Sequence, residues 1–361
     1  MDVQTTLPAG WPVLVTGAGG FIGGHVARRL AASGCRVRAL SRRLPTSAPA
    51  PAPGDPPIEW FQGDLERPDD IARAVRGMKG VVHVAGWVSL GADRAGVSRR
   101  VNVEATARLL DACDRAGVER LVYTSTLWTV AAGTAACPAD ERSAWNLEAV
   151  QSPYCQTKRE AERLVLERDR PGLRTSAICP ALVIGPGDRR PGSTTLLLMM
   201  ARTPIAVIGE GGIPLVDVRV LALAHQRALE GARPGVRSIV AGRYHSYSEI
   251  ARLVARVAGR PWRIVRMPDR SEGILRGLTR GLARLTGDRL GETLAEATVA
   301  GGFLKLFVDG SAADRAFALE HPDPLRSIHE TLDDHLRSGR APWLRLRPLE
   351  KAAEPMVPAP S

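Results

Sequence analysis

The sequence predicts an α/β protein built on a doubly wound parallel sheet, with a smaller C-terminal domain after it. Short apolar runs alternate with amphipathic helical stretches from residue 12 to about residue 180. Glycines at spacing three follow the first apolar run, and small or polar residues recur where the later runs end. Strands that alternate with helices at this spacing form parallel sheets with right-handed crossovers, and ligands bind at the carboxyl ends of the strands.

The first apolar run, Val13 to Val15, leads into the stretch Thr16-Gly-Ala-Gly-Gly-Phe-Ile-Gly23. From Phe21 the apolar residues fall on one helical face, and Gly34 lies just beyond the last turn. In such a strand–turn–helix, glycines allow a tight turn, a close approach to a pyrophosphate and close packing of helix on strand. The helix N-terminus then presents free N–H groups to the phosphates. We therefore predict a Rossmann-type dinucleotide site, with these cofactor-binding residues: Gly17, Gly20, Phe21, Ile22 and Gly23.

The remaining elements follow in order along the chain. Apolar runs predict strands at 36–40, 58–61, 81–84, 120–124, 174–179 and 238–241. Helical spacing of apolar residues predicts helices at 68–76, 102–116, 152–168, 218–229, 248–258, 271–285 and 324–338. We expect Ser152 and Ser248 to cap the helices that they precede or begin, and residues 45–57, rich in proline and alanine, to form a surface loop.

These elements predict how the chain divides into domains. A dinucleotide-binding domain is expected at 11–187, and residues 214–242 return to it. Residues 188–213 and 243–340 form a substrate-binding domain, and 341–361 form a mobile tail. The arginine-rich helix at 271–285 is interpreted as a solvated face, and contact with a membrane surface stays open as the alternative.

Composition excludes several classes of function. The chain has 361 residues, 44% of them hydrophobic and 24% charged, which is typical of a globular protein with a sizeable core. The net charge of +11 comes from arginines spread along the chain, and aromatic residues make up 4%, so we predict no nucleic-acid binding. Five cysteines without a Cys-x-x-Cys pair predict neither a disulfide framework nor a metal site. No apolar run is long enough for an integral membrane protein, and no leader precedes the first strand, so we expect a cytoplasmic protein.

The stretch Tyr154-Cys-Gln-Thr-Lys158 is the strongest indication of catalysis. A spacing of four places both side chains on one face of the predicted helix, at the carboxyl edge of the sheet. A lysine ammonium within a few Å is expected to lower the pKa of the tyrosine, which makes it a workable acid or base. Thr124-Ser125-Thr126, at the end of the fifth strand, offers hydroxyls to the same edge. The alternative is an ordinary surface pair beside a polar turn.

Taken together, these residues resemble the extended short-chain dehydrogenases/reductases, which include NAD-dependent epimerases/dehydratases, dihydroflavonol reductases and 3β-hydroxysteroid dehydrogenases. The resemblance runs from about residue 11 to 339 and includes Asn102-Val-Glu-Ala-Thr106 and the segment from Pro180 to Gly187. It implies these catalytic residues: Thr126, Tyr154, Lys158 and Asn102. It implies these further cofactor contacts: Asp64, Leu65, Val84, Ala85, Gly86, Thr124, Tyr154, Lys158, Pro180 and Val183. Leu127-Trp128 stand where the dehydratases have Asp-Glu, which argues against sugar-nucleotide dehydration.

The end of the second strand bears on cofactor choice. An acid there binds the 2′-hydroxyl of NAD, whereas arginine accommodates a 2′-phosphate. The chain reads Ser41-Arg42-Arg43, so NADP(H) is favoured, with Ser41 and Arg42 as contacts, and NAD(H) stays possible. We predict a reductase or dehydrogenase that interconverts a small-molecule ketone and secondary alcohol, and the resemblance implies a homodimer. An NAD-dependent sugar-nucleotide epimerase and a non-enzymatic NADPH-binding protein are the alternatives.

Overall fold

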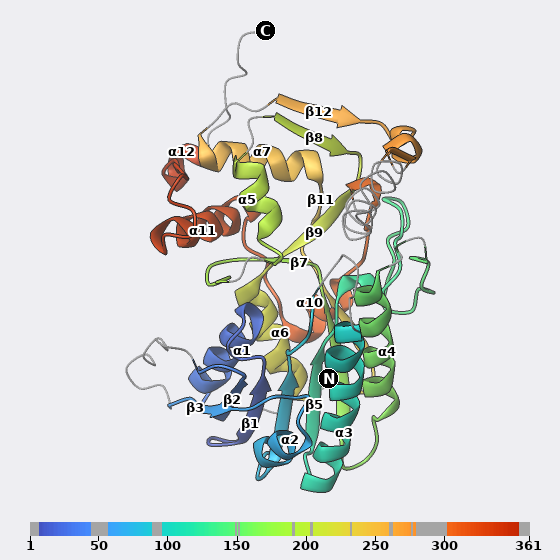
Figure 1. The fold of residues 1–361 in the computed structure, drawn as a ribbon, viewed down its shortest axis with the longest axis vertical. Helices are drawn as coiled ribbons and strands as arrows, with labels where there is room; N and C mark the ends of the chain where they lie inside the picture. Colours follow the sequence, from blue (N-terminus) through green and yellow to red (C-terminus); the bar gives the residue numbers. More distant parts are fainter. Residues whose placement is uncertain are drawn as a thin grey trace.

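The structure is a computed structural model that describes residues 7–44, 57–88, 96–148, 150, 152–189, 192–202, 205–231, 233–259, 263–275, 277–278 and 302–353. A seven-stranded parallel sheet in the order β10-β6-β5-β4-β1-β2-β3 forms its base (Figure 1). The strands are β1 (Pro12–Thr16), β2 (Arg36–Ser41), β3 (Glu59–Gln62), β4 (Gly80–His83), β5 (Arg120–Thr124), β6 (Arg174–Pro180) and β10 (Arg237–Val240). The strand order reverses between β1 and β4, and such a switch point is where ligands bind in this class of sheet.

Helices cover both faces of this sheet, because successive strand residues point to opposite sides. Val13 and Val15 pack with Leu30 in one buried cluster, and Leu14 packs with Leu109 in a second. The helices on the first face are α1 (Phe21–Ala32) and α6 (Val218–Leu229), which contact each other. Those on the second face are α2 (Pro68–Val75), α3 (Ala105–Ala116) and α4 (Pro153–Glu167). The predicted doubly wound α/β fold is confirmed.

Smaller sheets and further helices follow. They lie above the large sheet in Figure 1, except for the helix at 311–317, which packs against β10 and α6. One sheet has the order β11-β9-β7, and β12 pairs with β8 in another. These strands are β7 (Leu182–Ile184), β8 (Ile205–Gly209), β9 (Gly212–Asp217), β11 (Tyr244–Ser246) and β12 (Arg263–Met267). The helices are α5 (Thr195–Arg202), α7 (Tyr247–Ala258), α10 (Ser311–Phe317), α11 (Pro324–Arg337) and α12 (Leu349–Ala353), of which α5, α7 and α11 pack together. No helix in the described part of the chain is long and apolar enough to cross a membrane.

The start of the helix expected at 102–116 differs from the prediction. A π-helical turn, η2 (Arg99–Glu104), comes first and runs directly into α3. Widened turns of this kind are often found at functional sites, because they re-aim the side chains that they carry. Asn102 lies in this turn and is buried.

The cap position predicted at Ser152 is confirmed, whereas the cap predicted at Ser248 is wrong. Ser152 occupies the N-cap position of α4, but its side chain makes no capping hydrogen bond. In α7 the cap is Ser246 rather than Ser248, because only Ser246 stands three residues before Glu249, and the two exchange hydrogen bonds in a capping box.

The C-terminal prediction is wrong for residues 341–353. Ala341, Leu344 and Ala352 are buried, and α12 packs against α7 and α11. Small apolar residues between the prolines therefore add to the core, although the composition resembles that of a tail; residues 354–361 lie outside the described residues. Of the helix predicted at 271–285, residues 271–275 and 277–278 are helical, and the rest lies outside the described residues, as does most of the 45–57 loop.

Candidate functional site

The glycine turn between β1 and α1 is tightly packed. Gly17 has φ +68°, and a Cβ there would lie 2.8 Å from the Ala85 backbone nitrogen. A Cβ on Gly23 would run into the Gly17 carbonyl, so this glycine lets α1 approach the turn. Gly20 is the N-cap of α1, and no described side chain caps this end. The first N–H groups of α1, which begins with Phe21 and Ile22, are therefore available to an anion.

The ends of β2 and β3 lie side by side next to this turn. Ser41 pairs in register with Gln62, and a Cβ on Gly19 would run into the Ser41 hydroxyl. Arg42 is exposed and makes no ion pair with another described residue. After β3, Asp64 donates its backbone N–H to the Asp70 carboxylate at 2.9 Å, and Leu65 is buried.

The segment after β4 passes between the glycine turn and α4. The Ala85 N–H donates to Thr16 Oγ1 at 3.2 Å, and Val84 packs against the core. The Asn102 side chain accepts from the Trp87 N–H at 2.7 Å and donates to the Trp87 carbonyl at 3.0 Å. A Cβ on Gly86 would lie 3.3 Å from Asn102 Oδ1 and 3.8 Å from Lys158 Nζ. Asn102 therefore holds this segment beside the lysine.

The structure brings Thr126, Tyr154 and Lys158 together at the carboxyl end of β5. The Tyr154 hydroxyl is hydrogen-bonded to the Thr126 side chain. Lys158 Nζ donates to the Thr124 carbonyl oxygen at 2.6 Å. All of these residues are buried. Pro180 and Val183, at the end of β6 and within β7, are buried as well.

The expected effect of the lysine on the tyrosine is not seen. Burial raises the pKa of Tyr154 to about 12, and the hydrogen bond from Thr126 opposes this rise only in part. Burial also lowers the pKa of Lys158 to about 7. Both groups lose hydration, and desolvation disfavours each charged form more than the neighbours favour it. Tyr154 is consequently in its protonated, proton-donating form at neutral pH.

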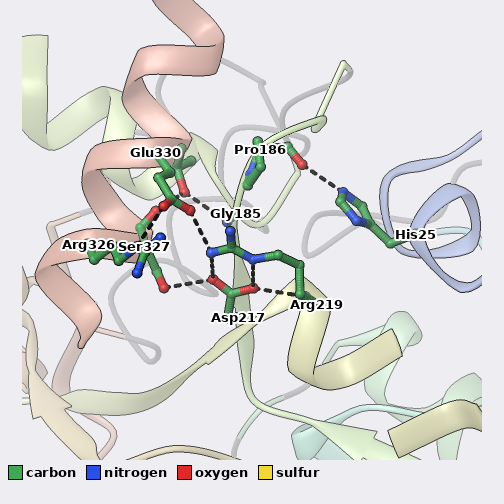
Figure 2. A network of polar contacts seen from close by, with 9 residues as sticks. His25, Gly185, Pro186, Asp217, Arg219, Arg326, Ser327 and Glu330 are labelled. Atoms are coloured by element: carbon green, nitrogen blue, oxygen red, sulfur yellow. Dashed lines mark hydrogen bonds and ion pairs between the residues drawn. The ribbon is translucent and has the colours of Figure 1, made fainter. Parts of the chain in front are cut away.

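The turn after β7 joins the large sheet to the second half of the chain and is fixed at several points (Figure 2). His25 Nε2 on α1 donates to the Pro186 carbonyl at 2.8 Å. Beside this turn, Asp217 Oδ2 accepts from Arg219 at 2.7 Å and from Ser327 Oγ at 2.7 Å. Arg219 also pairs with Glu330 at 2.6 Å, so the network in Figure 2 joins α6 to α11.

Sequence reasoning missed Glu162, a fully buried acid on α4 that contacts Ser125, Thr129 and Arg237. The available signal was its place four residues after Lys158, which puts it on the buried face of the helix. No cluster of described residues could hold a metal ion. The close-packed glycine turn and the open helix end fit the diphosphate of a dinucleotide.

Comparison with known proteins agrees with this geometry. A model of the NAD dependent epimerase/dehydratase family matches residues 13–240. A putative dihydroflavonol 4-reductase from Synechocystis sp. is 31% identical over 252 residues, which cover 68% of this chain and 72% of that protein. A 3-beta-hydroxysteroid dehydrogenase from Mycolicibacterium neoaurum is 31% identical over 220 residues, 59% of this chain and 58% of that protein.

Another relative, a 3 beta-hydroxysteroid dehydrogenase/Delta 5-->4-isomerase from Mycobacterium tuberculosis, is 37% identical over 49% of this chain and 48% of its own length. The chain thus spans about half the length of these steroid dehydrogenases. The solved structure of UDP-glucose 4-epimerase from Thermus thermophilus, a complex with NAD, has a TM-score of 0.68 at 24% identity, over 90% of this chain and 98% of that one, and has the same fold. The chain therefore belongs to the NAD-dependent epimerase/dehydratase family and is an oxidoreductase of the extended short-chain dehydrogenase/reductase type.

Proposed function

We propose that this protein is an NADP(H)-dependent reductase or dehydrogenase that interconverts a ketone and a secondary alcohol by hydride transfer. The observation that carries the proposal is the hydrogen bond between the buried hydroxyls of Tyr154 and Thr126, with Lys158 one helical turn away. Two hydroxyls in contact have room to bond the same carbonyl oxygen, one donating a proton and the other sharing the developing charge.

The chain's own residues would prepare the carbonyl for reduction. The reduced nicotinamide, when bound, supplies the hydride to the carbonyl carbon. Tyr154 donates its proton to the carbonyl oxygen, and Thr126 holds that oxygen in place. An ammonium on Lys158 compensates the negative charge that forms on Tyr154. Burial of all three groups strengthens these interactions, because little water screens them.

Other residues would hold the cofactor. The turn at Gly17, Gly20 and Gly23 and the N-terminus of α1 suit the pyrophosphate. Asp64 and Leu65 would lie on the adenine side. The residues proposed to line the nicotinamide side are Val84, Ala85, Gly86, Thr124, Pro180 and Val183.

The exposed Arg42 supports a preference for NADP(H), since no described acid neutralises it and no acid ends β2. Arg42→Ala is expected to lower the ratio of kcat/KM for NADPH to that for NADH by about tenfold or more, because a charge-assisted contact to the 2′-phosphate is lost. Steady-state kinetics with both cofactors measure this ratio. Arg36→Ala is the matched control, as Arg36 is exposed at the opposite end of the same strand. An unchanged ratio in Arg42→Ala would refute the contact.

The substrate class is proposed from the relatives' chemistry and the local surface. Relatives are named as a dihydroflavonol 4-reductase, a 3-beta-hydroxysteroid dehydrogenase and a 2-alkyl-3-oxoalkanoate reductase. Trp87 and Val88, directly after Gly86, are 39% and 66% exposed. Exposed apolar side chains beside the site support an apolar ketone as substrate.

The nucleotide carried by the purified protein tests the reaction type. The protein is denatured, the released nucleotide is identified by mass, and NADPH oxidation is followed with a panel of apolar ketones. We expect empty protein or a fraction of NADP(H), with turnover on at least one ketone. Stoichiometric NAD⁺ without ketone turnover would favour the sugar-nucleotide epimerase, and nucleotide binding without any turnover would favour a non-enzymatic protein. The homodimer and the cytoplasmic location stay predictions.

A further inference from the structure

Glu162 is a fully buried carboxylate that the proposed reaction does not use. It lies on α4, one turn beyond Lys158. Its Oε2 accepts a hydrogen bond from Ser125 Oγ and lies 2.6 Å from Thr129 Oγ1 and 3.4 Å from Cys179 Sγ. Donors around a buried carboxylate replace part of the hydration that it loses on burial.

Arg237 on β10 provides the positive partner of this carboxylate. Its Nη2 lies 2.8 Å from Glu162 Oε1, and its Nη1 donates to the Thr129 carbonyl at 3.2 Å. The arginine side chain is 25% exposed and lines a cavity of about 470 Å³, whereas the Glu162 side chain is 1% exposed. The ion pair therefore joins a partly exposed arginine to a buried carboxylate.

The segment held by Glu162 is the one that carries the proposed catalytic contacts. Thr124 accepts the hydrogen bond from Lys158, and Thr126 is bonded to Tyr154. Thr129 donates its N–H to the Thr126 carbonyl at 3.1 Å and reaches Glu162 with its hydroxyl. Glu162 thus ties the segment 124–129 to the same helix that carries Tyr154 and Lys158.

We propose that Glu162 is a positioning residue of this site, which anchors segment 124–129 to α4 and supplies a negative charge that favours the protonated form of Lys158. This inference rests on the proposed function for its catalytic meaning. The contacts themselves do not depend on which ketone or alcohol the enzyme uses. Burial lowers the pKa of Lys158 and Glu162 opposes this fall, so without Glu162 a smaller fraction of the lysine would carry the charge that compensates Tyr154.

The other described groups around Lys158 do not replace this charge. The centroid of the Tyr123 ring lies 4.1 Å from Lys158 Nζ. Burial raises the pKa of the Tyr123 hydroxyl well above its usual value, so this group is neutral. Burial likewise raises the pKa of Cys179, so this thiol is neutral at ordinary pH. Burial lowers the pKa of His83 to about 3, so it too is neutral, and Arg237 is paired with Glu162. Of the described groups around the lysine, Glu162 is therefore the one whose negative charge favours the Lys158 ammonium.

The titration of Lys158 tests the inference without any turnover. The full chain is labelled with lysine that carries ¹³C at the ε position, and the ¹³C shifts are followed by NMR as a function of pH. The lysines are Lys79, Lys158, Lys305 and Lys351, so the spectrum is simple, and Lys158→Arg assigns the signal. Glu162→Gln should lower the midpoint of Lys158 by about one pH unit or more, because removal of an adjacent opposite charge disfavours the ammonium.

Matched variants distinguish the effect of the Glu162 charge on Lys158 from a general change in the structure of α4. Glu160→Gln removes an acid from the same helix that pairs with Arg99 at the surface, and the Lys158 midpoint should stay unchanged. Glu162→Asp retains the negative charge, so the titration midpoint of Lys158 should lie close to its wild-type value. If Glu162→Gln does not fold, the double variant Glu162→Gln/Arg237→Gln removes both charges, leaves no unpaired buried ion, and should lower the midpoint in the same direction.

The outcomes for the two proposals are distinct. A Lys158 midpoint that is the same in wild type and in folded Glu162→Gln, or in the double variant, would overturn the role of Glu162 even if ketone turnover is found. A lowered midpoint in a protein that turns over no ketone would leave the coupling intact and reject the proposed function. A midpoint that falls equally in Glu160→Gln would mean a general response of α4 and would also reject the inference.

Discussion

Tyr154→Phe is expected to lower turnover by about 10²- to 10⁴-fold, the usual contribution of a positioned general acid. Phenylalanine keeps the ring in its buried site but removes the hydroxyl that is bonded to Thr126. The carbonyl oxygen would then have no proton donor among these residues except Thr126, whose hydroxyl is a much weaker acid than a phenol. Affinity for NADPH should stay close to that of the wild type, because the glycine turn and the ends of β2 and β3 are not altered.

The measurement is single-turnover reduction with saturating NADPH, together with a fluorescence titration of the cofactor. Tyr123→Phe is the matched control: its hydroxyl is also buried, and it makes no hydrogen bond to any described group. Loss of that hydroxyl should leave both the rate and the fold intact. Equal rates in Tyr154→Phe and wild type would reject Tyr154 as the proton donor.

Gly23→Ala is expected to weaken NADPH binding by about a hundredfold or more, equivalent to roughly 3 kcal/mol. An added Cβ would run into the Gly17 carbonyl oxygen and would lie 2.7 Å from the Gly17 carbonyl carbon and 3.0 Å from the Ala18 nitrogen. These are backbone atoms of the turn itself, so they cannot rotate away as a side chain could. α1 must shift away from the turn, and the N–H groups at its N-terminus move away from the pyrophosphate.

The same change should destabilise the fold by about 1–3 kcal/mol, the usual cost of overpacking a close contact. Isothermal titration with NADPH and chemical denaturation measure the two effects separately. Gly24→Ala is the control, since its Cβ would meet the Ala18 carbonyl at 3.3 Å and alanine favours the helix more than glycine does. If the two alanine variants bind NADPH equally well, the turn does not approach the cofactor as proposed.

Features that depend on local backbone geometry and on periodicity could be predicted from the amino-acid sequence. The turn at Gly17 and Gly23 was predictable because only glycine leaves the room that the backbone needs there. Tyr154 and Lys158 share a helical face because their spacing of four is close to one turn. The apolar runs and the helices between them predicted the doubly wound sheet, and its strand order agrees with that prediction.

Contacts between groups far apart in the sequence could not be predicted, because they depend on how the whole chain folds. Glu162 and Arg237 are 75 positions apart in the sequence, and their ion pair forms because β6 brings β10 close to α4. The packing of residues 341–353 and the contacts of Asn102 likewise depend on how distant elements pack against each other.

The pKa of Tyr154 shows most directly why the sequence was not sufficient. From the spacing alone, the nearby lysine was expected to lower this pKa, yet burial raises it to about 12. The spacing of two residues along a helix determines their proximity, but it contains no information about how much water the rest of the fold removes from them. Desolvation is a property of the packed molecule, and at Tyr154 it exceeds the opposing effect of the Thr126 hydrogen bond.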